Sequence, residues 1–146
     1  MLPRGGFSLG LFILAKTNLV MREEIFNWFA QAKDDYEKAQ ILYGKSKFDG
    51  CVFFCQQAAE KALKAACMAK VREIPKGHSI VYLASVAKAP ASLMSGIRDL
   101  NPEYLITRYP DMAAGIPARL YDAEIARRHL STAKEVLEWS GRRTRA

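Results

Sequence analysis

Hydrophobic residues recur with a helical period along most of the chain. Between about residues 22 and 43, a set of apolar and aromatic positions falls within one arc when successive residues are spaced by about 100°. Gly44 follows this stripe, and glycine commonly ends helices, so the pattern predicts an amphipathic helix over residues 22–43. The charged residues Asp34 and Asp35 lie mostly off the stripe, and we expect them to be solvated. The apolar positions are Ile25, Trp28, Phe29, Ala32, Tyr36, Ala39 and Tyr43.

A second stripe predicts a helix over about residues 49–71. Its apolar side is rich in alanine, which permits close approach of a neighbouring helix, and we expect its polar side to face solvent. On that polar side, Glu60 and Lys64 are four residues apart, which is the spacing of a common surface ion pair. Phe53 and Phe54 lie toward the polar side and indicate a second packing surface, against another helix or another subunit. The polar positions are Gln57, Glu60, Lys61 and Lys64.

Proline and glycine divide the middle of the chain into short elements. Pro75 and Gly77 interrupt the helical pattern, and Ser79 is a plausible N-cap for a short helix that ends before Pro90. Another short helix is expected around residues 93–100, and Asn101-Pro102-Glu103 is typical of an N-cap, a first residue and a first-turn acid. The segment RYPD, residues 108–111, is expected to form a turn, and residues 111–118 a loop.

The last predicted helix covers about residues 122–140 and has two apolar stripes. Gly141 is expected to end it. His129 lies on one stripe and is expected to be a core or interface histidine, and Trp139 suggests a subunit interface. No run of alternating apolar and polar residues is long enough to indicate a β-strand. The chain is therefore predicted to be all-α, an antiparallel up-and-down bundle of four to five helices.

Most of the net charge of +7 lies at the two ends of the 146-residue chain. Residues 1–20 and 141–146 contain five basic residues and no acid, so the remaining chain is nearly balanced, which argues against a broad nucleic-acid surface. Residues 1–20 resemble a weak signal peptide but lack its cleavage pattern. We interpret them as an extension outside the fold, followed by a helical domain over residues 21–140 and a solvated basic tail over residues 141–146.

Cysteine usage favours a reducing, cytoplasmic setting. The three cysteines, Cys51, Cys55 and Cys67, are odd in number and lie in one predicted helix, where they are expected to be small buried hydrophobic residues. No further ligand completes a tetrahedral metal set, so we expect neither a metal site nor a cofactor.

A few polar residues could bind a phosphate or a nucleotide, although each has a simpler interpretation. Lys61 and Lys64 could form a cationic shelf for a phosphate. Arg108 could clamp a phosphate while Tyr109 stacks on a base, or Arg108 could pair with Asp111 and stabilise a turn. His78 could be a general base or a phosphate ligand, or it could cap the helix that it precedes.

Three ordered motifs resemble those of the HEPN domain, whose name stands for higher eukaryotes and prokaryotes nucleotide-binding. They are FFCQQAAEKALKA (residues 53–65), KGHSI (76–80) and TRYPD (107–111), within a resemblance that covers residues 22–139. The resemblance implies a homodimer and an accessory role beside a minimal nucleotidyltransferase, often in a prokaryotic toxin–antitoxin system. It also implies nucleotide binding, and it favours His78 and Arg108 because they fall on motif positions.

Two alternative functions stay open. Some HEPN proteins are metal-independent ribonucleases with an Arg-x(4–6)-His motif, and Arg72 and His78 have this spacing here. The intervening EIPKG cannot form a regular helix, however, and in those relatives the motif lies near the start of the last long helix, so this pair is interpreted as a fortuitous match. The other alternative is a non-catalytic helical scaffold that makes contacts through Phe53, Phe54 and Trp139.

Overall fold

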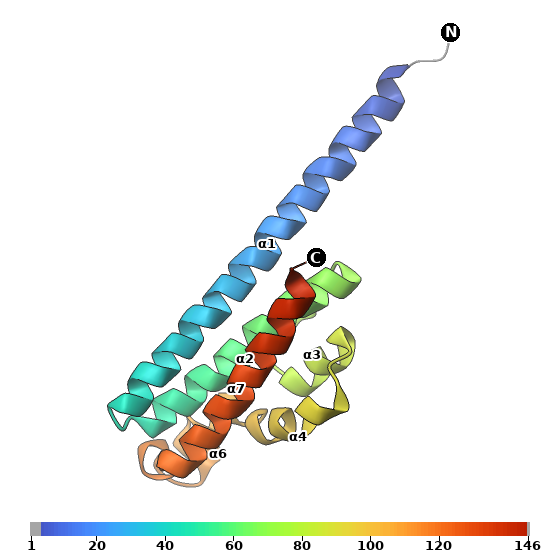
Figure 1. The fold of residues 1–146 in the computed structure, drawn as a ribbon. Coiled ribbons are helices and arrows are strands. Elements are labelled where there is room, and N and C mark those ends of the chain that lie inside the picture. The colour runs from blue at the N-terminus through green and yellow to red at the C-terminus, as the bar shows by residue number, and fades with distance from the viewer. Residues whose placement is uncertain (1–3, 146) are drawn as a thin grey trace.

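Three long helices form the frame of the protein in a computed structural model that describes residues 4–145. They are α1 (Arg4–Gly44), α2 (Phe48–Val71) and α7 (Ala123–Thr144). As Figure 1 shows, α1 runs antiparallel to α2, while α2 and α7 run in the same direction and end beside the middle of α1. The described residues form helices, turns and loops without a strand, which confirms the all-α prediction.

Short elements carry the chain from the end of α2 back to the start of α7. They are α3 (Ile80–Ala87), α4 (Ala91–Leu100), α5 (Glu103–Ile106), α6 (Pro110–Ala113) and the 3-10 helix η1 (Pro117–Arg119). Ser79 caps α3 as predicted, because its hydroxyl accepts a hydrogen bond from the backbone N–H of Tyr82.

The centre of the bundle is α2, which packs against α1, α3 and α7. Five of its six alanines and all three cysteines are buried, and burial of the cysteines was predicted for small apolar residues. These small side chains let the neighbouring helices approach closely, while larger residues such as Leu63, Ile80 and Ile97 fill the remaining space. The polar residues of α2 are consequently held close to the residues of α1 and of the loop before α3.

The first helix begins at Arg4, far before the predicted start near residue 22. The predicted helix began too late because the apolar stripe marks only the part of the helix that contacts the bundle. A helix can continue beyond that contact. The residues between include leucine, alanine and lysine, which are good helix formers, and no proline interrupts them. Residues 9–20 form an arm, a part of α1 that projects beyond the bundle (Figure 1). Large apolar side chains of this arm, such as Phe12 and Leu19, are exposed. None of the helices in the described part of the chain has the length and apolarity needed to span a membrane.

Three other local predictions were wrong. Gly141 does not end the last helix, which continues to Thr144, and a side chain at this position would lie 3.0 Å from the ring of Phe29. Asn101 does not cap the helix that follows it, because its side chain accepts a hydrogen bond from the backbone N–H of Ile80. The expected turn and loop over residues 108–118 contain the helical turn α6 and the 3-10 helix η1.

His129 lies in the core, as its apolar surroundings in the sequence indicated. It is 1% exposed, and its Nδ1 atom has no hydrogen-bond partner among the described residues. Its Nε2 atom is 3.9 Å from the Glu103 carboxylate, whose other oxygen accepts a hydrogen bond from Tyr121. Burial lowers the pKa of His129, and burial raises the pKa of Glu103.

The buried histidine should make stability depend on pH. Below about pH 6.5 the unfolded chain binds a proton at His129 that the folded chain resists, so the free energy of unfolding decreases as the pH falls through that range. His129→Leu cannot titrate and loses no hydrogen bond. Chemical denaturation at a series of pH values should show wild type losing stability relative to the variant from about pH 7 to about pH 5. If the free energy of unfolding depended on pH in the same way for wild type and for the variant, the result would contradict this account.

Candidate functional site

The polar side of α2 is largely buried, which overturns its predicted exposure to solvent. Glu60 is 4% exposed and Lys64 is 7% exposed, and Gln56 is fully buried. The prediction failed because the helix is covered on more than one side, by α1 and by the loop that leads into α3. The expected surface ion pair between Glu60 and Lys64 is therefore an internal one.

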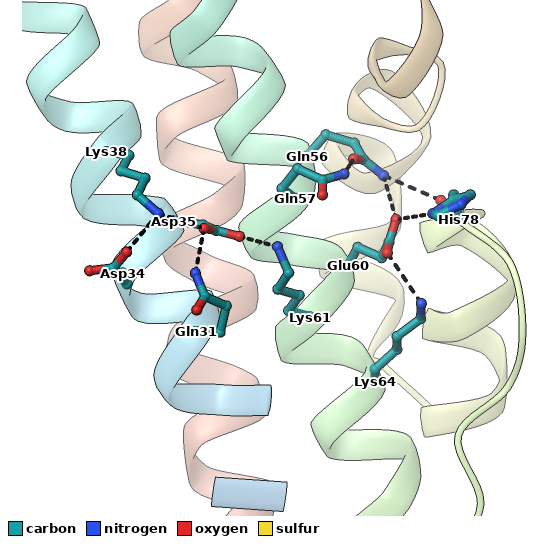
Figure 2. Close-up of polar contacts among 10 residues, drawn as sticks. All are labelled: Gln31, Asp34, Asp35, Lys38, Gln56, Gln57, Glu60, Lys61, Lys64 and His78. Carbon is teal, nitrogen blue, oxygen red and sulfur yellow. Dashed lines mark hydrogen bonds and ion pairs between the residues drawn. The ribbon is translucent and has the colours of Figure 1, made fainter. Parts of the chain in front are cut away.

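The Glu60 carboxylate contacts the side chains of Lys64, His78 and Gln56 (Figure 2). One oxygen lies 3.2 Å from the ammonium of Lys64, and the other lies 3.0 Å from Nδ1 of His78. The side-chain amide of Gln56 donates hydrogen bonds to Glu60 and to the backbone carbonyl of His78, at 3.4 Å and 3.2 Å. Because the carboxylate can only accept hydrogen bonds, neutral His78 must carry its proton on Nδ1, which leaves Nε2 as an acceptor.

A second buried carboxylate, Asp35, joins α1 to α2. Asp35 is 2% exposed, so the expectation that it is solvated was wrong, whereas Asp34 is exposed and pairs with Lys38. Asp35 forms an ion pair with Lys61 and accepts a hydrogen bond of 2.9 Å from Gln31 (Figure 2). Each buried carboxylate of this region thus has a lysine of α2 as its partner.

These ion pairs reduce the ability of Lys61 and Lys64 to bind a phosphate. Lys61 is paired with Asp35, and Lys64 is paired with Glu60 and lies 5.2 Å from the centre of the Trp28 ring. A lysine whose charge is balanced by a buried carboxylate offers little net attraction to a phosphate. The geometry favours a structural role for both lysines over the predicted cationic shelf.

His78 opens a stack of rings and a guanidinium group on the surface beside Glu60. Its imidazole lies parallel to the ring of Tyr104, with 4.2 Å between the two centres. The guanidinium group of Arg108 lies 4.4 Å from the centre of the Tyr104 ring and 4.9 Å from that of Tyr109. Arg108 Nε also donates a hydrogen bond to the backbone carbonyl of Tyr104, which fixes the guanidinium plane.

The remaining predicted site residues divide between this surface and the core. The ring of Phe53 lies 5.2 Å from the Arg108 guanidinium and packs edge-on against Phe54, so both phenylalanines are half-buried beside the stack. Asp111 is exposed, and no ion pair joins it to Arg108 in the described part of the chain. Trp139 is 5% exposed and belongs to the core of this chain, so its ring offers little surface to a second subunit.

Arg72 and His78 are held in different places. Arg72 adopts the left-handed conformation that ends α2, and its guanidinium group donates a hydrogen bond of 2.7 Å to Asn18 on α1. His78 is bonded to Glu60, which lies about 18 Å away from Arg72 along the helix axis at 1.5 Å per residue. Within one chain, the two residues of the ribonuclease-like spacing do not form one site.

Comparisons with known proteins agree with this architecture. The family model of the HEPN domain matches residues 26–143. The crystal structure of TT1696 from Thermus thermophilus is 32% identical in sequence, has a TM-score of 0.77, and the match covers 82% of this chain and 98% of that chain. The crystal structure of ST0689, an archaeal HEPN homologue, is 28% identical, with a TM-score of 0.74 and coverage of 84% and 98%. None of the curated proteins compared with the chain is significantly similar to it.

Removing the Glu60 carboxylate should be far more costly than the loss of a surface ion pair. Glu60→Ala leaves the ammonium of Lys64 buried without its partner and should lower the free energy of unfolding by about 3–5 kcal/mol. The double variant Glu60→Leu, Lys64→Met removes both charges and should recover most of that loss. Urea denaturation measures both effects. A cost below about 1 kcal/mol for Glu60→Ala would place the pair in the range of exposed ion pairs.

Proposed function

Because this chain belongs to the HEPN domain family, we propose that it is a HEPN accessory protein that binds a nucleotide on the surface formed by His78, Tyr104, Arg108 and Tyr109. The observation that carries this proposal is the stack of Arg108 on Tyr104 and Tyr109 beside His78. A guanidinium group is a strong ligand for phosphate oxygens, and an exposed aromatic ring can stack on a base.

Two details of the stack support phosphate binding. No carboxylate of the described residues pairs with Arg108, so its terminal N–H groups are available to an anion, and exposed Tyr109 follows it directly. His78 presents Nε2 on the same surface because Glu60 holds Nδ1. The lysines contribute indirectly, since Lys64 balances the carboxylate that positions His78.

The wider setting that we propose follows from the family. The protein would act as a homodimer with a minimal nucleotidyltransferase in a prokaryotic two-gene system of the toxin–antitoxin type. The three free, buried thiols support a cytoplasmic location. Phe53 and Phe54 are candidates for the subunit interface because they lie half-buried at the edge of the stack.

A ribonuclease is the second candidate, and one observation favours it. A buried carboxylate that fixes the tautomer of a half-exposed histidine is a common arrangement around general bases. The Glu60–His78 pair has this geometry, with the Arg108 guanidinium group close by. This candidate would use His78 and Arg108 in place of Arg72, and cleavage of RNA without added metal that His78→Ala abolishes would support it.

Calorimetric titration of the purified protein with ATP tests the leading proposal. Wild type should bind saturably, and Arg108→Ala should bind at least about tenfold more weakly, which corresponds to about 1.4 kcal/mol. Arg142→Ala is the matched control because it removes an exposed arginine from the last turn of α7, at the other end of the bundle, and it should bind like wild type. Absence of ATP binding by wild type, or equal affinity in Arg108→Ala, would reject the nucleotide site.

A further inference from the structure

A groove lies at the opposite end of α2 from the stack, where the arm of α1 leaves the bundle. It encloses about 690 Å³ between α1 and the last turns of α2 and α7. Met68 in this groove lies about 22 Å along α2 from Phe53, so the groove and the stack are separate surfaces. We propose that this groove is the docking site for an acidic amphipathic helix of a partner protein.

The groove has an apolar floor arranged for a helix. Met21, Ile25 and Phe29 recur every four residues on one side of α1, and Met68 faces them from α2. Phe26 also lines the groove and is 69% exposed, so a large apolar ring beside the floor is available to a partner. The stripe from Asn18 to Lys33 is about 22 Å long, which matches a partner helix of about 15 residues.

The groove is lined by basic residues and by no acidic residue. Among the described residues, no side-chain carboxylate forms an ion pair with any of its cations. Their known contacts are with neutral groups: Arg72 donates to Asn18, Lys33 lies over the Phe29 ring and Arg143 lies over the Trp139 ring. This charge is therefore available to an acidic partner. The cations are Arg22, Lys33, Arg72, Arg143 and Arg145.

The helix macrodipole does not account for this charge by itself. Basic residues commonly stabilise the last turn of a helix, and α2 and α7 both end at the groove, which is sufficient to explain Arg72 and Arg143. Arg22 and Lys33, however, lie in the middle of α1, where no helix ends. These two cations, about 16 Å apart along α1, extend the basic charge along the length of the apolar stripe.

An acidic helix fits these features better than the other occupants do. The arm of a second copy, residues 9–20, is apolar, but its one charged residue is Lys16, so it would bring like charge into the groove. A nucleic acid would satisfy the cations but would leave the aliphatic floor of Met21, Ile25 and Met68 without matching apolar groups. A helix with leucines on one side and glutamates beside them would pack its leucines on the apolar floor and pair its glutamates with the cations of the groove.

Fluorescence anisotropy with a designed peptide tests the proposal. The probe is a labelled amphipathic helix of about 18 residues with leucines on one face and glutamates on its flanks. Full-length protein should bind it saturably, with weaker binding at high salt, and should not bind the same peptide carrying lysines in place of the glutamates. Failure to bind the acidic peptide, or equal binding of the two peptides, would overturn the proposal.

Variants place the binding in the groove. Arg22→Glu with Arg143→Glu should weaken binding at least about tenfold, and Ile25→Ser, which alters only the floor, should weaken it as well. Arg119→Glu with Arg127→Glu reverses the same amount of charge at exposed positions outside the groove and should leave the affinity unchanged. Equal losses in the two charge-reversal variants would indicate general attraction between charges and would contradict a groove site.

Two further measurements exclude the other occupants. An oligouridylate that displaces the peptide from wild type, with an affinity that Ile25→Ser does not change, would show that the groove binds nucleic acid. Sedimentation of wild type as a dimer that Ile25→Ser dissociates would show that a second copy covers the groove. Either result would overturn the proposal. A failure of ATP binding at Arg108 would leave it standing, since the two surfaces are independent.

Discussion

Two buried carboxylates, Asp35 and Glu60, determine how the charged residues of this bundle are arranged. A carboxylate removed from water is costly unless it is paired and hydrogen-bonded, and each of these has a lysine of α2 as its ionic partner. Asp35 thereby joins α1 to α2. Glu60 joins α2 to the loop that carries His78, and that loop leads to the surface where Tyr104 and Arg108 lie.

This arrangement separates structural charge from charge that is available to ligands. Lys61 and Lys64 are the most conspicuous cations of α2 in the sequence, yet their charge is balanced within the fold. Arg108 has no such partner among the described residues, and the cations of the groove have none either. Charge that is available to a ligand is therefore present at the guanidinium of Arg108 on one surface and in the basic groove at the other end of α2.

Much of the fold could be predicted from the sequence because helical periodicity directly reflects burial against neighbours. The centre of α1, the bounds of α2 and the Ser79 cap were all predicted, and the motif positions of His78 and Arg108 placed these residues near one another. The start of α1 was not predicted, since a helix that projects beyond the bundle has no buried stripe. Gly141 was misread because its missing side chain makes room for Phe29, a contact between distant parts of the chain.

The site was predicted less completely because its hydrogen bonds join distant segments. Glu60 and Asp35 were interpreted as surface residues, and no local pattern distinguishes a solvated acid from one covered by another helix. The spacing of Gln56, Glu60 and Lys64 shows that they share one side of α2, but it does not show whether another segment covers that side. Tyr104 was missed altogether, since its role depends on stacking between His78 and Arg108, and its sequence neighbours give no sign of this.

The most direct test is the protonation state of the His78 ring, measured by 15N NMR at a pH where the imidazole is neutral. If the buried Glu60 carboxylate organises the site, the proton must lie on Nδ1, and Nε2 must be unprotonated. Glu60→Gln should disturb this state, because an amide can also donate a hydrogen bond. A proton on Nε2 in wild type, with Nδ1 unprotonated, would contradict the hydrogen bond on which the site depends.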